Sequence, residues 1–148
     1  MTRNQTVTHI TLWVNRTVML LVALLLPTLP FILRWYSNFR ALTAAEHTAI
    51  LIAFYCCAMV TALALWNMDV LLRNILQQEV FIRKNVSCIR RIRWCCGLIS
   101  LICLPAAFVY LPLIFMVIIM AFLCLVVTVV VRVMAAAVLI REENDLTI

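Results

Sequence analysis

The longest uncharged stretch of this chain, from Trp94 to Val131, constrains its fold more than any other feature. As one straight helix, its 38 residues would be roughly 57 Å long, whereas the hydrocarbon core of a bilayer is about 30 Å thick. The stretch also contains Pro112, and proline is tolerated best in the first turn of a helix, where no amide donor is needed. A helical hairpin is therefore predicted. Its parts are a helix over about 94–109, a tight turn near Tyr110 and a helix over about 112–132.

The composition extends this argument to the whole chain. Hydrophobic residues make up 67% of it and charged residues 12%, against roughly 25% charged residues in soluble domains. A soluble fold of this size cannot bury so much apolar surface, and disorder requires low hydrophobicity, so an integral membrane protein is predicted. Two further uncharged runs predict spans over about 16–34 and 45–67. Thr43 and Glu46 have the spacing of a capping box at the start of the second span.

The four tryptophans give an independent indication of where the spans end. An indole ring is apolar while its N–H needs a polar partner, so tryptophan is enriched at membrane interfaces. Trp13 and Trp35 flank the first span, Trp66 ends the second and Trp94 opens the third. Both the tryptophans and the charged residues therefore predict the same span boundaries.

The lysine and arginine residues predict the orientation, because membrane proteins concentrate them on the cytosolic side. With the N-terminus inside, ten of the twelve basic residues lie in the cytosol, and Arg34 and Arg40 lie outside. We therefore predict an all-α fold, a bundle of four transmembrane helices in a single domain over 1–148, with both termini cytosolic. The net charge of +6 is then mainly a topology signal and does not predict direct binding of nucleic acid.

Two cytosolic segments are expected outside the membrane, a loop over 68–93 and a tail over 141–148. Apolar residues with helical spacing after Met68 predict that the second span continues inward by several turns. Asn85 is a candidate N-cap for a helix leading into the third span. The basic residues of the loop are predicted to contact anionic lipid or an acidic partner. They are Arg83, Lys84, Arg90, Arg91 and Arg93.

The acidic tail offers these arginines a partner within the chain, because it returns to the same side of the membrane. We hypothesise an ion pair between Arg90, Arg91 or Arg93 and an acidic residue of the tail. Exposed pairs of this kind contribute less than about 1 kcal/mol, so the contact would position the tail rather than stabilise the fold. The acidic candidates are Glu142, Glu143 and Asp145.

Two segments of the chain resemble a known family. One is the terminal sequence over 142–148 (EENDLTI), which directly follows a last membrane helix, and the other is the loop sequence over 81–85 (FIRKN), followed by Ile89 and Arg90. Together with four spans, these segments resemble the bacterial membrane-protein family described as domain of unknown function 2975 (DUF2975). The resemblance implies a location in the bacterial inner membrane and an association with a small helix-turn-helix regulator encoded nearby. It brings no catalytic residues.

No residue pattern predicts an enzyme, a cofactor or a metal site. A membrane thiol oxidase needs Cys-x-x-Cys pairs at the outer surface, whereas the vicinal pairs 56–57 and 95–96 are expected in mid-span and near the cytosolic edge. We interpret the cysteines as small apolar packing residues, and a thiol-redox protein is the least favoured alternative. His9 and His47 are expected on opposite sides of the membrane, so they cannot share a metal ion.

A small transporter or export factor for a hydrophobic substrate is the main alternative function. Coupling to protons requires an ionisable group within the membrane, and no Asp or Glu lies deep in a predicted span. The leading prediction is a non-enzymatic interaction or regulatory protein that acts through the basic loop and the acidic tail; whether it forms an oligomer is left open. The interior polar residues are expected to bond helix backbones rather than to line a pathway. They are Tyr55, Thr61, Ser100 and Thr128.

Overall fold

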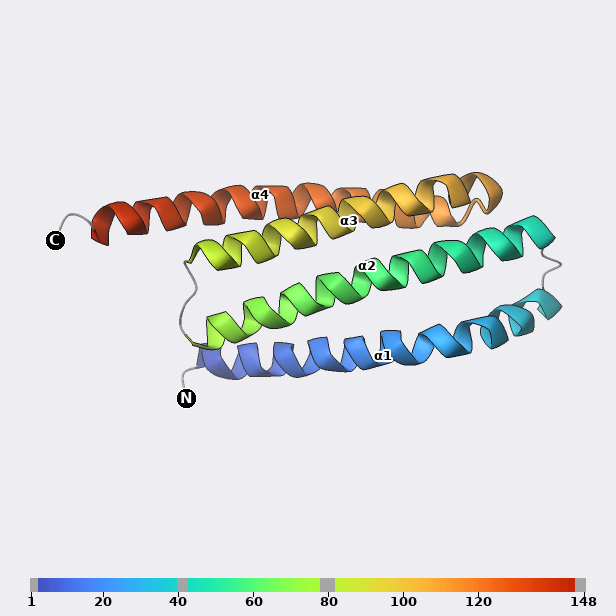
Figure 1. Ribbon diagram of the computed structural model, residues 1–148, viewed down its shortest axis with the longest axis horizontal. Helices are drawn as coiled ribbons and strands as arrows, with labels where there is room; N and C mark the ends of the chain where they lie inside the picture. The colour runs from blue at the N-terminus through green and yellow to red at the C-terminus, as the bar shows by residue number, and fades with distance from the viewer. Residues whose placement is uncertain (1–2, 40–42, 78–81, 146–148) are drawn as a thin grey trace.

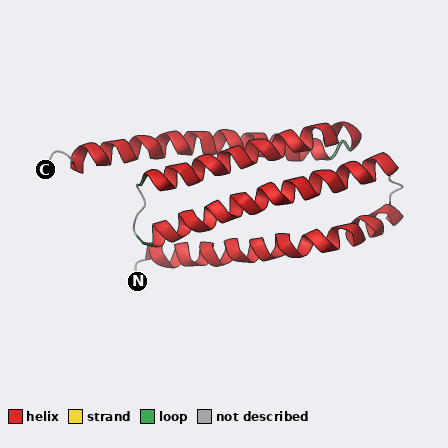
Figure 2. Cartoon of the chain, viewed as in Figure 1, coloured by secondary structure: helices red, strands yellow, loops and turns green. Residues whose placement is uncertain are grey.

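The chain folds into four antiparallel helices that run side by side (Figure 1). The computed structural model describes residues 3–39, 43–77 and 82–145. All of the described elements are helices (Figure 2), and each is long and apolar enough to cross a membrane. The prediction of an all-α fold with four helices able to span a membrane is confirmed. The helices are α1 (Arg3–Phe39), α2 (Ala44–Leu76), α3 (Arg83–Val109) and α4 (Leu113–Asp145).

The helices are longer than the uncharged runs that predicted them. α1 has 37 residues and α2 has 33, which makes them about 50 to 55 Å long against a hydrocarbon core of about 30 Å. Arginine, glutamate and glutamine are good helix formers, so charge at the interface does not end a helix. Most of the segment 68–93, expected as a loop, is therefore helical, because α2 runs to Leu76 and α3 begins at Arg83. The expected helical continuation of the second span past Met68 is confirmed, and the tail is helical as far as Asp145.

The start of α2 carries the predicted capping box. The Thr43 hydroxyl oxygen accepts a hydrogen bond of 3.3 Å from the Glu46 amide, and the Glu46 carboxylate accepts one of 2.8 Å from the Thr43 amide. Two free donors at the helix start are thereby satisfied. The predicted turn near Tyr110 is also confirmed, since Tyr110 caps α3 and α4 begins at Leu113.

The predicted N-cap of α3 is wrong. Ile82 caps the helix without a side-chain hydrogen bond, and Asn85 lies within its first turn. The Asn85 side chain is fully buried and accepts a hydrogen bond from Asn74 of α2. The Asn85 side chain, expected to cap the helix end, therefore bonds a residue of the neighbouring helix α2.

Helices that follow one another in sequence pack against one another in space, α1 on α2, α2 on α3 and α3 on α4. Within the described ranges, the backbone of α1 approaches α2 and no other helix. Two hydrophobic clusters hold the other three helices together. One centres on Leu71, Ile89 and Val138, and the other on Val60 and Cys103. The helices therefore pack in the order of the sequence, and side chains of α2, α3 and α4 meet in the two clusters.

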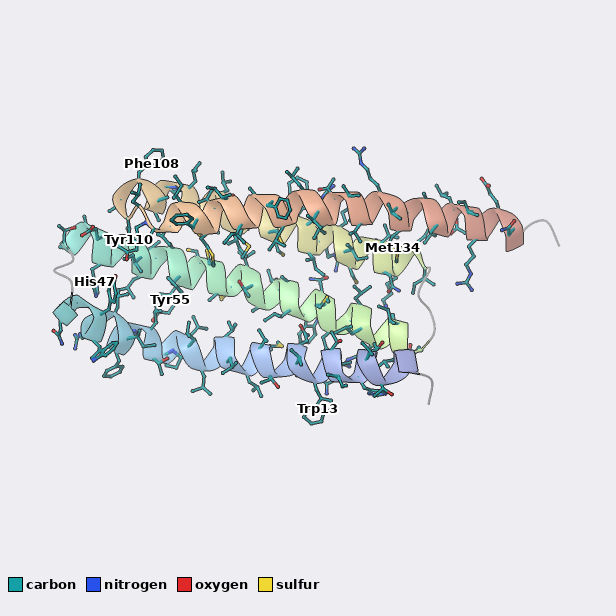
Figure 3. The ribbon with its side chains drawn as sticks, turned by 180° about the vertical axis from the view of Figure 1, so that it is seen from behind. Trp13, His47, Tyr55, Phe108, Tyr110 and Met134 are labelled. Carbon is teal, nitrogen blue, oxygen red and sulfur yellow. The ribbon has the colours of Figure 1, made fainter. Side chains whose placement is uncertain are left out.

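Aromatic side chains mark both ends of the apolar region. Trp13 and Trp35 are exposed on α1, 22 residues apart, which places them about 33 Å apart along the helix axis, close to the thickness of the hydrocarbon core. Figure 3 shows Trp13 pointing away from the other helices, at the opposite end from His47 and Tyr110. Near that second end, the hydroxyl oxygens of Tyr36 and Tyr110 lie 3.1 Å apart and join α1 to the turn after α3.

Candidate interaction surface

The start of α3 and the end of α4 meet in a bidentate ion pair. The Arg83 Nε atom lies 2.8 Å from Glu142 Oε1, and its Nη2 atom lies 2.7 Å from Oε2. Two parallel charge-assisted hydrogen bonds fix both the distance and the relative orientation of two groups. The side chains are 78% and 40% exposed, so the pair lies open to solvent.

The charged end, as we name it, consists of Arg83, Lys84, Glu142 and Glu143. All four residues have side chains at least partly exposed. Both signs of charge are therefore presented together, from the first turn of α3 and the last turns of α4. The side chain of Asp145, the remaining acidic candidate, lies outside the described residues.

The hypothesised ion pairs of Arg90, Arg91 and Arg93 with Glu142 are wrong. Glu142 pairs with Arg83 in the described structure. The cause is the antiparallel packing of α3 and α4, because Arg90 lies seven residues beyond Arg83 and hence about 10 Å further along the helix. The part of α4 that lies beside Arg90 therefore precedes Glu142 by about two helical turns.

A buried polar contact between α2 and α3 lies next to the charged end. The Asn74 amide nitrogen of α2 donates a hydrogen bond of 2.7 Å to Asn85 Oδ1 of α3, and both side chains are buried. Val86 and Ile89 continue this face of α3 into the hydrophobic cluster with Val138 of α4. The first turn of α3, which carries Arg83, therefore rests on packed neighbours from two helices.

A second ionic cluster at the same end joins α1 to α2. One oxygen of Asp69 lies 3.3 Å from Arg16 Nε, and the other lies 2.6 Å from Arg73 Nη2. Asp69 is 13% exposed, whereas both arginines are more than half exposed. One turn away, Asn15 donates a hydrogen bond of 3.2 Å to the carbonyl of Leu65. These polar contacts join α1 to α2, the one described helix that the backbone of α1 approaches.

The interior polar residues mostly bond helix backbones, as expected. The Tyr55 hydroxyl donates to the carbonyl of Leu26 on α1, and the Ser100 hydroxyl donates to the carbonyl of Val117 on α4, each at 3.2 Å. Thr128 bonds its own helix, with 2.7 Å to the carbonyl of Cys124. These three hydroxyls are thus used in structural contacts.

The sulfur atoms of Cys57 and Cys103 lie 3.5 Å apart at the interface of α2 and α3. The sequence predicts no contact between these two cysteines, because no local pattern links residues 46 positions apart. All seven cysteines are free. The vicinal partner Cys56 is exposed, so the two members of that pair have different surroundings.

Within the described residues, no group of three or more His, Cys, Asp and Glu side chains lies close enough to hold a metal ion. His9 lies beside Trp13 on α1, and His47 lies in the first turns of α2, at the other end of the fold.

Residues 4–148 match the sequence profile of the family described as protein of unknown function (DUF2975). The chain belongs to this family. The match covers nearly the whole chain, so the resemblance inferred from the terminal and loop segments is confirmed. No curated protein and no solved structure is significantly similar to the chain.

Proposed function

We propose that this DUF2975 protein is a non-enzymatic regulatory component of the bacterial inner membrane, and that the charged end is its docking surface for a soluble partner. The observation that carries this proposal is the bidentate pair of Arg83 and Glu142, which fixes the start of α3 against the end of α4. A surface held in one geometry loses less conformational entropy when a partner binds.

The proposed orientation places this surface in the cytosol. One end of the fold holds the start of α1, the end of α2, the start of α3 and the end of α4 (Figure 1). Most of the lysine and arginine residues belong to this end. Positive residues are retained on the cytosolic side during insertion. A regulator that works in the cytosol would then reach the charged end without crossing the membrane.

The chemistry of the surface favours a protein partner over nucleic acid. Arg83 pairs with Glu142, and Lys84 and Glu143 follow these two residues in the sequence. Carboxylates repel the phosphate backbone that dominates nucleic-acid binding. A protein partner can present complementary charges of both signs, which gives specificity and faster association. The family resemblance suggests a small helix-turn-helix regulator for this role, bound through its protein surface.

Site-directed photo-crosslinking in cells tests the proposal. A photoreactive amino acid at Lys84, which is exposed on the charged end, is expected to capture a soluble regulator. The same amino acid at Asn38, exposed at the opposite end of α1, provides the matched control. Capture from Asn38 but not from Lys84 would show that the docking surface, or its orientation, is assigned wrongly.

A second candidate function is the transport of a hydrophobic substrate. It is favoured by an apolar cavity of about 300 Å³ between α2, α3 and α4, lined by Phe54, Cys103 and Met116 among others. Flux of a lipophilic dye across proteoliposome membranes tests this function. The variant Met116→Trp would fill the cavity and should abolish flux if the cavity is the pathway. Absence of flux from the unaltered protein would exclude transport of that dye.

A further inference from the structure

A groove runs between α3 and α4 on the membrane side of the charged end. Its volume is about 430 Å³, within the range of ordinary ligand sites. Arg93 and Trp94 lie at the end nearest the interface, and Gly97, Leu98 and Leu101 continue along α3 towards the middle of the membrane. The groove is thus basic at one end and apolar along its length.

Small residues keep the groove open. Gly97 is the only glycine of the chain, and Cys124 of α4 lies opposite it, 3.6 Å from where a Cβ atom would stand. The polar atoms of the α4 wall are already used, because the Cys124 sulfur bonds the carbonyl of Arg93 and the Thr128 hydroxyl bonds the carbonyl of Cys124. The wall therefore presents hydrocarbon-like surface to an occupant.

The basic end of the groove lies at the depth of lipid headgroups. Trp94 is exposed, as expected of an interfacial tryptophan, and the Arg93 guanidinium carbon lies 5.4 Å from the centre of its ring. Arg93 forms no ion pair with an acidic side chain in the described part of the chain. Arg90 on α3 and Arg132 on α4 each lie about one turn beyond the groove towards the interface. Positive charge is thus concentrated around this opening.

We infer that this groove is a binding site for one anionic phospholipid, whose phosphate contacts Arg93 and whose acyl chain lies over Gly97 and Leu101. Charge complementarity at the opening selects the anionic headgroup, and the apolar length of the groove selects a lipid over a free anion. The contact of Arg93 with Trp94 holds the guanidinium at the opening. The site is separate from the charged end and does not depend on the proposed docking function.

Native mass spectrometry of the full chain, released from detergent with added phosphatidylglycerol or phosphatidylcholine, tests the site. We expect one phosphatidylglycerol molecule to be retained in preference to phosphatidylcholine. Arg93→Gln should weaken phosphatidylglycerol binding about tenfold, the loss expected when one charged hydrogen-bonding group is removed. Arg91→Gln removes the same charge from an exposed position outside the groove and should change binding less than about twofold.

Two variants of Gly97 test the place of the acyl chain. Gly97→Leu projects a large side chain into the groove and should prevent retention of the lipid, whereas Gly97→Ala adds a methyl group at ordinary contact distance from Cys124 and should retain it. Circular dichroism of each variant verifies its helix content. Equal weakening by Arg91→Gln and Arg93→Gln would show only general attraction between charges. Retention of phosphatidylglycerol by Gly97→Leu would show that the groove is not the site.

Discussion

Asn74 donates a hydrogen bond of 2.7 Å to Asn85, whose side chain is fully buried between α2 and α3. Asn85→Ala removes the acceptor and leaves the buried amide of Asn74 without this partner. We expect the free energy of unfolding to fall by about 1 to 3 kcal/mol, the cost of an unsatisfied buried polar group. Thermal unfolding in detergent, followed by circular dichroism, measures the change.

Asn144→Ala is the matched control, because Asn144 is an exposed asparagine near the end of α4. Its free energy of unfolding should equal that of the unaltered protein to within about 0.5 kcal/mol. If Asn85→Ala were as stable as this control, the hydrogen bond would contribute nothing to the packing of α2 on α3.

The hydrogen-bond partner of Asn85 could not be predicted from the sequence. Asparagine near a helix start is typical of an N-cap, since its side chain can accept from free backbone amides. In the structure, that side chain instead bonds Asn74, and this partner is set by how α2 and α3 pack. Residue type and local spacing carry no information about such a contact.

Asp69 provides a test of how α1 is attached. Arg16→Gln removes the contact between helices, whereas Arg73→Gln removes a contact within α2, four residues along the same helix. We expect Arg16→Gln to lower the free energy of unfolding by about 1 kcal/mol and Arg73→Gln by about 0.3 to 0.5 kcal/mol, because both arginines are half exposed and screened by solvent.

Denaturation at low and high salt supplies the control for this pair. The difference between Arg16→Gln and the unaltered protein should shrink as salt rises, because ionic strength screens exposed charges. A difference that does not depend on salt would show that Arg16 acts through its packing and not through Asp69.

The two sulfur atoms at 3.5 Å predict a specific crosslink between α2 and α3. In a chain that keeps only Cys57 and Cys103, an added oxidant should join the helices, because a small movement brings the sulfurs to the bond length of about 2.05 Å. A protease site placed between α2 and α3 reports the bond, since the cut halves stay together until a reductant is added.

A chain that keeps only Cys56 and Cys103 is the control for this crosslink. Cys56 is next to Cys57 in the sequence but is exposed. The two halves of this control chain should therefore separate after cleavage. Equally efficient crosslinking of the two chains would mean that α2 rotates or that its register against α3 differs from the structure.

Several features of the fold follow directly from the sequence. The hairpin at Tyr110 was predictable because an uncharged run too long for one span contains proline. The capping box at Thr43 was predictable because it depends on two residues three positions apart. Both features are local, and local spacing determines them.

The contacts of the charged end depend on register and could not be predicted in the same way. The basic segment and the acidic tail were both recognisable, yet the arginine that meets Glu142 is Arg83. Which arginine pairs depends on how far the helices continue past the membrane, and uncharged runs do not define that length. The groove over Gly97 depends on the same register between α3 and α4.

The proposed docking role of the charged end is tested most directly by charge reversal. The helix-turn-helix regulator proposed as its partner is co-expressed, and its capture by the protein in mild detergent is measured. We expect Arg83→Glu and Glu142→Arg each to reduce capture about tenfold. The double variant restores an ion pair within the chain but presents reversed charges, so capture should stay low. Arg34→Glu, at the opposite end of α1, should capture as much regulator as the unaltered protein. Full capture by both single variants, or its recovery in the double variant, would contradict a docking role for this surface.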